Sequence, residues 1–99
     1  MEKIVHHWGC RIVAGASLTP GPKIQIEYEV IPETEEAIRI YGEFWSPKPA
    51  HSTMATLDID PRPGANPLAK ALETAVEMAI VEIEQTWAAM EKRSLEREQ

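Results

Sequence analysis

Three histidines and two aspartates are the side chains of this sequence that most readily bind metal ions or transfer protons. His6 and His7 are adjacent, and neighbouring residues of a strand point to opposite faces, so a regular strand cannot direct both at one ion. His51 could join one of them only if a carboxylate served as a third ligand. Asp58 and Asp60 share one face of a strand end, where two carboxylates can hold Mg²⁺. Partly buried structural histidines and an exposed strand end before a turn are the simpler explanations.

Cys10 is the one cysteine of the chain, so neither an intrachain disulfide nor a multi-cysteine zinc site can form. It could act as a nucleophile with His6, because the predicted strand places both on one face. That face is the apolar one, and a buried thiol is chemically inert. The five glycines form no phosphate-binding loop, and no serine lies in a G-x-S-x-G elbow. We therefore predict a protein that is not an enzyme and that uses neither a metal nor a cofactor.

The charge balance excludes one class of partner. The 99 residues include 10 basic and 16 acidic side chains, and the net charge of -6 is unsuited to gripping nucleic acid by its phosphates. No apolar run approaches the roughly 18 residues that span a bilayer. The N-terminus shows no signal peptide pattern, so we expect a cytoplasmic protein without membrane contact. The length predicts a single domain, 1–99.

Two patterns of hydrophobic spacing divide the chain. Residues 1–60 alternate with period two and predict a sheet, with strands at 3–14, 23–31, 37–45 and 51–59. Residues 61–66 are rich in proline and glycine and predict a linker turn. Residues 67–99 repeat every three to four positions and predict a helix, with Asn66 as its N-cap and Pro67 in its first turn. The predicted fold is α+β: a four-stranded antiparallel meander with one long C-terminal helix packed on one face (β-β-β-β-α).

One helix covers one sheet face, so the other face should be open to water. We assign the covered face to the apolar residues of each strand, which include Ile4, Trp8, Ile12, Ile26, Ile38 and Ile40. The open face then carries most of the charge, together with Tyr41, Trp45 and Met54.

The acidic residues concentrate between 27 and 43. A solvated face that protects a strand edge is the common explanation. The functional alternative is a footprint for a basic nucleic-acid-binding protein, in which carboxylates replace phosphates. The candidate partner-binding residues are Glu27, Glu29, Glu33, Glu35, Glu36, Arg39, Tyr41, Glu43, Trp45 and Met54.

The predicted helix is longer than the sheet beneath it. Its distal part still offers Trp87, Met90 and Leu95, and we expect a homodimer in which these three residues form the seam. The alternative seam is the open sheet face, where Tyr41, Trp45 and Met54 could meet their symmetry mates. Taken together, the sequence predicts a small acidic binding protein that occludes or bridges a macromolecular partner. Accessory and inhibitor proteins of mobile genetic elements are an analogy for such a role. The alternative is a small-ligand or metal-dependent enzyme domain that uses His6, His7, His51 and Asp58.

Overall fold

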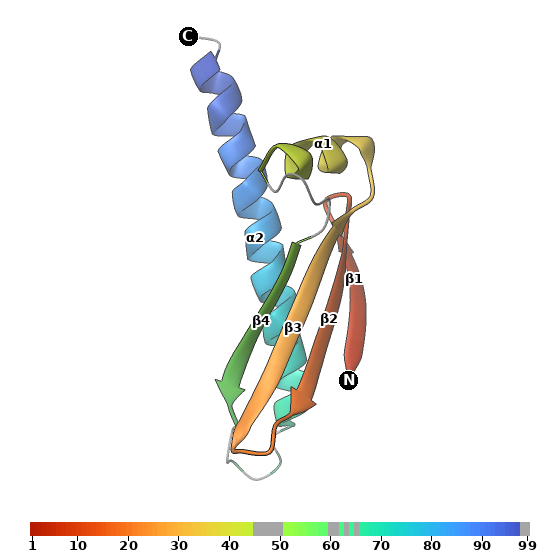
Figure 1. Ribbon diagram of the computed structural model, residues 1–99, viewed down its shortest axis with the longest axis vertical. Helices are drawn as coiled ribbons and strands as arrows, with labels where there is room; N and C mark the ends of the chain where they lie inside the picture. Colours follow the sequence, from red (N-terminus) through yellow and green to blue (C-terminus); the bar gives the residue numbers. More distant parts are fainter. Residues whose placement is uncertain (45–50, 60–61, 63, 65, 98–99) are drawn as a thin grey trace.

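The computed structural model of the chain describes residues 1–44, 51–59, 62, 64 and 66–97. Four antiparallel strands form one sheet in the order β1-β2-β3-β4, and a long helix packs on one of its faces (Figure 1). This confirms the predicted α+β fold class. The elements are β1 (Glu2–His7), β2 (Cys10–Leu18), β3 (Lys23–Pro32), α1 (Glu35–Phe44), β4 (His51–Asp58) and α2 (Pro67–Arg97).

The predicted first strand, 3–14, is two strands. β1 ends at His7 and β2 begins at Cys10, and the chain reverses in the two-residue turn Trp8-Gly9. Both turn residues have positive φ, 47° for Trp8 and 77° for Gly9, as in the type I′ turns that suit hairpins. The reversal changes which residues of β1 point inward.

The predicted inward face of β1 is therefore wrong. Val5 lies opposite Ile12 in the hairpin and points toward α2, whereas Ile4 is 53% exposed. Trp8, predicted to anchor the core, sits in the turn and is 49% exposed.

The predicted third strand, 37–45, is instead the helix α1, within the described residues that end at 44. Thr34 begins it, because the backbone N–H of Ala37 donates to Thr34 Oγ1 at 3.2 Å. Two glutamates occupy the first turn, where negative charge favours a helix. Ala37, Ile40 and Tyr41 are buried at helical spacing, while Ile38 is 47% exposed. The element order is therefore β-β-β-α-β-α.

The core lies between the sheet and α2. β3 alternates as predicted, with Ile24, Ile26, Tyr28 and Val30 buried. The helix buries Leu72, Ala75, Ala79 and Ile83 from its predicted stripe. The side chains where α2 meets the sheet are small, so the helix can approach the sheet closely. These small residues are the buried alanines at positions 14, 16, 75 and 79.

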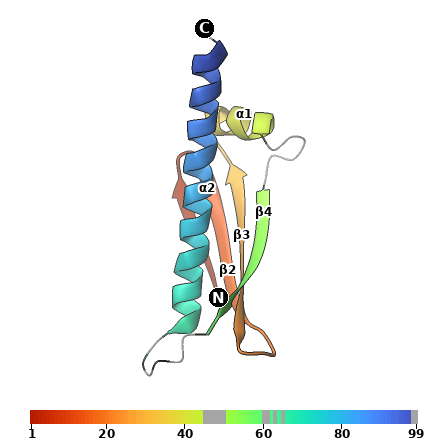
Figure 2. The same ribbon diagram turned by 90° about the vertical axis from the view of Figure 1, so that its left-hand side faces the viewer.

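α2 begins as predicted and extends past the sheet. Asn66 caps it, since the N–H of Ala69 donates to Asn66 Oδ1 at 3.1 Å. Its 31 residues span about 46 Å, whereas the ten residues of β3 span about 33 Å. The last turns therefore run beyond the sheet, and α1 lies beside α2 near the sheet's upper end (Figure 2).

Candidate functional site

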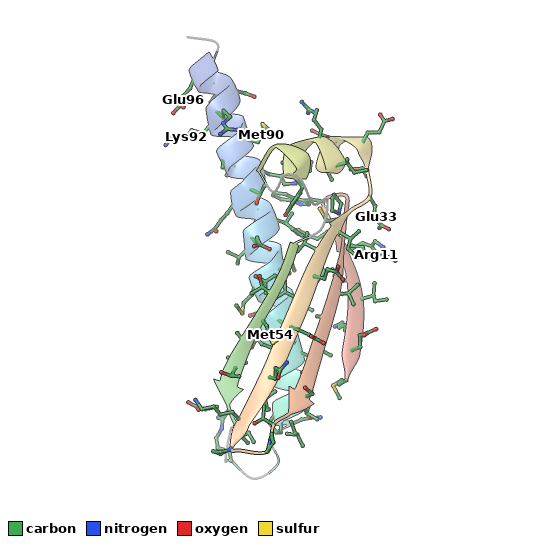
Figure 3. All side chains as sticks on the ribbon, viewed as in Figure 1. Arg11, Glu33, Met54, Met90, Lys92 and Glu96 are labelled. Atoms are coloured by element: carbon green, nitrogen blue, oxygen red, sulfur yellow. The ribbon has the colours of Figure 1, made fainter. Side chains whose placement is uncertain are left out.

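The face of the sheet opposite α2 carries three of the predicted partner-binding residues. Glu27 lies between Gly15 of β2 and Met54 of β4 in the register, and Glu29 follows two positions later on the same face. Met54 is 65% exposed, and Figure 3 shows its place on β4. Its sulfur accepts a hydrogen bond of 3.2 Å from Gln25 Nε2, which holds the side chain across the strands.

A hollow of about 250 Å³ lies on this open face above Gly15. Glu2, Glu27 and Glu29 line it, and we call it the acidic hollow. A Cβ at position 15 would lie 3.2 Å from Glu27 Oε1, so the glycine leaves room for this carboxylate over β2. None of these three carboxylates forms an ion pair with another described residue. The hollow therefore presents carboxylates that a partner can pair with.

Glu33 is separate from the acidic hollow and is already paired. Its carboxylate lies 3.7 Å from Arg11 Nε and 3.4 Å from His6 Nε2, at the upper end of the sheet. Figure 3 shows Arg11 and Glu33 side by side there. Because a neighbouring cation offsets the charge of Glu33, this residue adds little to an acidic surface.

The remaining predicted partner-binding residues are not where the prediction placed them, because the predicted strand 37–45 is the helix α1 in the described residues. Glu35, Glu36 and Arg39 lie on α1, away from the sheet face. Tyr41 is fully buried, so its predicted position on the open face is wrong. Burial is also the main reason that the pKa of its hydroxyl is raised. The side chain of Glu43 and all of Trp45 lie outside the described residues.

The candidate metal and acid–base residues do not come together. His6 points to the open face near Glu33, and His7 points to the α2 side, where its Nε2 lies 3.2 Å from Glu84 Oε2. Asp58 lies at the opposite end of the sheet and pairs with Lys23 at 3.2 Å. The side chain of His51 and all of Asp60 lie outside the described residues. Within the described part of the chain, no three His, Cys, Asp or Glu side chains are placed to hold a metal ion.

Cys10 faces the core and not His6. The turn at Trp8-Gly9 puts Cys10 on the α2 side of the sheet, so its predicted position on one face with His6 is wrong. Burial, and then the nearby Glu33 carboxylate, raise the pKa of the thiol from 9.0 to about 11. A thiol in this environment is a poor nucleophile.

Native Cys10 should react slowly with iodoacetamide at pH 8. The raised pKa lowers its thiolate fraction by about 100-fold relative to an ordinary thiol, and burial excludes the reagent further. Mass spectrometry of samples alkylated with and without urea measures the difference. Equal rates in the native and unfolded protein would contradict the buried position.

A second concave region lies where the β1–β2 turn, α1 and the upper part of α2 meet. This cleft of about 490 Å³ has an apolar wall and a charged rim, and we call it the aromatic cleft. Its lining comprises Trp8, Glu36, Arg39, Ile40, Glu84, Trp87, Ala88, Met90, Glu91 and Ser94.

Aromatic contacts hold Trp8 at the edge of this cleft. Its ring stacks on His7 at 5.1 Å between centroids and meets Trp87 edge-on at 5.8 Å. A non-glycine residue with left-handed φ costs about 1–2 kcal/mol, so these contacts offset an unfavourable backbone. The isolated Gly9 within the alternating segment 3–14 was the signal in the sequence that could have indicated a break in the strand.

Two residues of the predicted dimer seam contact their own chain. Trp87 meets Trp8, and Met90 is 9% exposed on the side of α2 turned toward α1 (Figure 3). Leu95 lies further along the helix and is 57% exposed. The homodimer stays a prediction. Contacts within the chain already explain why the side chains at positions 87 and 90 are apolar.

Comparison with known proteins adds no assignment. The chain matches no protein-family model, no curated protein and no solved structure. Among the described residues, no helix has the length and apolar character needed to cross a membrane.

Proposed function

We propose that this protein is a non-enzymatic binding protein whose open sheet face contacts a basic region of another protein. The observation that carries the proposal is the acidic hollow, which three glutamates line and where none of them forms an ion pair with another described residue. A basic side chain of a partner is attracted to carboxylates that share one hollow.

The surroundings of the acidic hollow suit a lysine or arginine side chain. Ile4 and Met54 are 53% and 65% exposed on the same sheet face, and they provide apolar surface for the aliphatic stem of such a side chain. Exposed ion pairs contribute only about 0.2–1 kcal/mol each. The carboxylates therefore select the partner and speed its association, while apolar contact contributes the larger part of the affinity.

A nucleic-acid-binding protein is the partner class that this chemistry favours. Its basic groove is built to accept phosphates, and carboxylates on a rigid sheet can occupy the same positions. The protein would then occlude that groove, as an accessory or inhibitor protein of a mobile genetic element does. The net charge of -6 makes direct binding to duplex DNA weak at physiological salt.

A paired affinity capture tests this proposal. The Glu27→Gln/Glu29→Gln variant removes two charges from the acidic hollow, and Glu73→Gln/Glu77→Gln removes two from the exposed surface of α2. Quantitative mass spectrometry then compares the proteins that each variant retains from a lysate of the source cells. We expect a basic partner that the α2 variant retains and the open-face variant loses at least tenfold.

The affinity of that partner should fall steeply with salt and be reduced by added duplex DNA. Equal loss with both variants would mean that overall charge, and not the open face, drives capture. Full retention by the open-face variant would contradict the proposed surface.

A further inference from the structure

The aromatic cleft has the dimensions and walls of a ligand site that is separate from the open sheet face. Its volume of about 490 Å³ falls within the about 300–1,000 Å³ usual for small-molecule sites. Trp8, Trp87, Ile40 and Met90 supply an apolar and largely aromatic wall. Three separate elements contribute to this wall, so folding assembles it from residues far apart in the sequence.

The placement of Trp8 is the first indication of a ligand. Turns of this type favour asparagine or glycine at the position that Trp8 occupies, because those residues tolerate left-handed φ. The fold nevertheless holds a large indole there, fixed by His7 and Trp87 and 49% exposed. Backbone strain that keeps an aromatic ring open to solvent beside a cleft is a feature typical of functional positions.

The charges around the cleft are the second indication. The carboxylates of Glu36, Glu84 and Glu91 line it, against one guanidinium, that of Arg39. Glu84 also contacts His7 Nε2 at 3.2 Å. The lining is therefore net negative, which disfavours an anionic ligand. A divalent metal is also disfavoured, since no three ligating side chains among the described residues are grouped to hold one.

We propose that the aromatic cleft binds an alkylated ammonium group. Indole rings attract such a cation through their π faces, and its alkyl substituents pack on the apolar wall. The rim carboxylates provide the balancing charge without needing direct hydrogen bonds from the cation. Free quaternary amines and methylated lysine side chains share this chemistry, and the proposal does not depend on the function assigned to the open face.

Choline and its neutral carbon isostere, 3,3-dimethylbutan-1-ol, are the matched probes for this site. NMR of the indole N–H groups of Trp8 and Trp87 reports binding directly. We expect choline to shift both signals in a saturable way, and the neutral alcohol to bind at least tenfold more weakly. Equal binding of the two probes, or no shift at tens of millimolar choline, overturns the proposal.

Two variants of α2 separate the charge of the cleft from the charge of the helix. Glu91→Gln removes a rim carboxylate, and Glu96→Gln makes the same change on the same helix outside the cleft. We expect the first to weaken choline binding several-fold and the second to leave it unchanged. Identical behaviour of the two variants overturns the proposal. Both positions are exposed, so both proteins should fold.

Substitution of the aromatic wall completes the test. Trp8→Leu should lower the affinity for choline at least tenfold, and Trp8→Phe should retain part of it because a π face remains. Circular dichroism checks that both variants are folded. If folded Trp8→Leu binds choline as the unaltered protein does, the aromatic wall is not the site.

Peptides distinguish the two sources of the cation. If a peptide with trimethyllysine binds more tightly than choline, and the unmodified lysine peptide does not, the ligand is a protein side chain. If the trimethyllysine peptide binds no better than choline, the ligand is a free quaternary amine.

Discussion

Replacing Ile83 with alanine should lower the free energy of unfolding by about 2–5 kcal/mol, the range for large-to-small changes in a core. Ile83 is fully buried where α2 crosses the sheet, so the loss removes apolar burial and leaves a cavity. A domain of this size is stable by only about 5–15 kcal/mol. The loss is therefore a large fraction of the total, and urea denaturation followed by circular dichroism measures it.

Val81→Ala is the matched control for this change. Val81 lies on the same helix two residues earlier and is 51% exposed. Its truncation should change stability by no more than about 0.5 kcal/mol, because surface substitutions have small effects and alanine favours a helix. If both variants lose the same stability, α2 does not pack on the sheet through the face described above.

Replacing Gly9 with alanine should cost about 2–4 kcal/mol, through two separate effects. The residue has a φ of 77°, which an L side chain adopts with strain, and a Cβ there would collide with Thr34 Oγ1. The carbonyl of Gly9 also accepts hydrogen bonds from the N–H groups of Glu33 and Thr34, at 2.8 and 3.2 Å. Moving the turn to relieve the collision would therefore loosen the start of α1. Thermal and urea unfolding both report the loss.

Two further variants separate the causes of this effect. Gly42→Ala changes a glycine of α1 around which a Cβ meets nothing within 4 Å, and it should raise stability by about 0.5–1 kcal/mol. In the Gly9→Ala background, Thr34→Ala should cost less than it does alone, since it removes the collision together with the helix cap. Additive costs would show that the collision is absent and that only backbone strain acts.

The elements with unbroken periodicity could be predicted from the sequence. β3 shows clean alternation, and α2 combines a helical stripe with an N-cap and no internal glycine or proline. α1 could not be predicted in this way. Its apolar residues Ile38, Ile40 and Phe44 fit the period of a strand as well as that of a helix. In the structure the buried residues of this segment are Ala37, Ile40 and Tyr41.

The β1–β2 turn was missed for a different reason. A two-residue turn shifts the phase of the alternation, so the inward residues have odd numbers in β1 and even numbers in β2. The sequence hides this shift, because Ile4 and Val5 are both apolar and residues 6 and 7 are both histidine. Only the left-handed geometry at Trp8-Gly9 marks the reversal, and tryptophan is an unusual residue for it. The strand count was still correct, since this division added one strand and the helix α1 removed one.

The two candidate sites also differ in how far the sequence alone could predict them. Glu27, Glu29 and Met54 lie on neighbouring strands, so alternation alone predicted their common face. The aromatic cleft depends on how the turn, α1 and α2 pack together, which no local pattern in the sequence contains. Its two tryptophans are nearly 80 positions apart, at 8 and 87.

The order of the elements along the chain has a consequence for biosynthesis. All four strands precede α2, and α2 supplies the stripe that covers Ile24, Ile26 and Val30. A ribosome adds about 5–20 residues per second, so the 31 residues of α2 take about 2–6 s to appear after the sheet sequence is complete. During that interval α2 cannot cover the apolar side of the nascent sheet, and transiently exposed apolar surface of this kind is prone to aggregation.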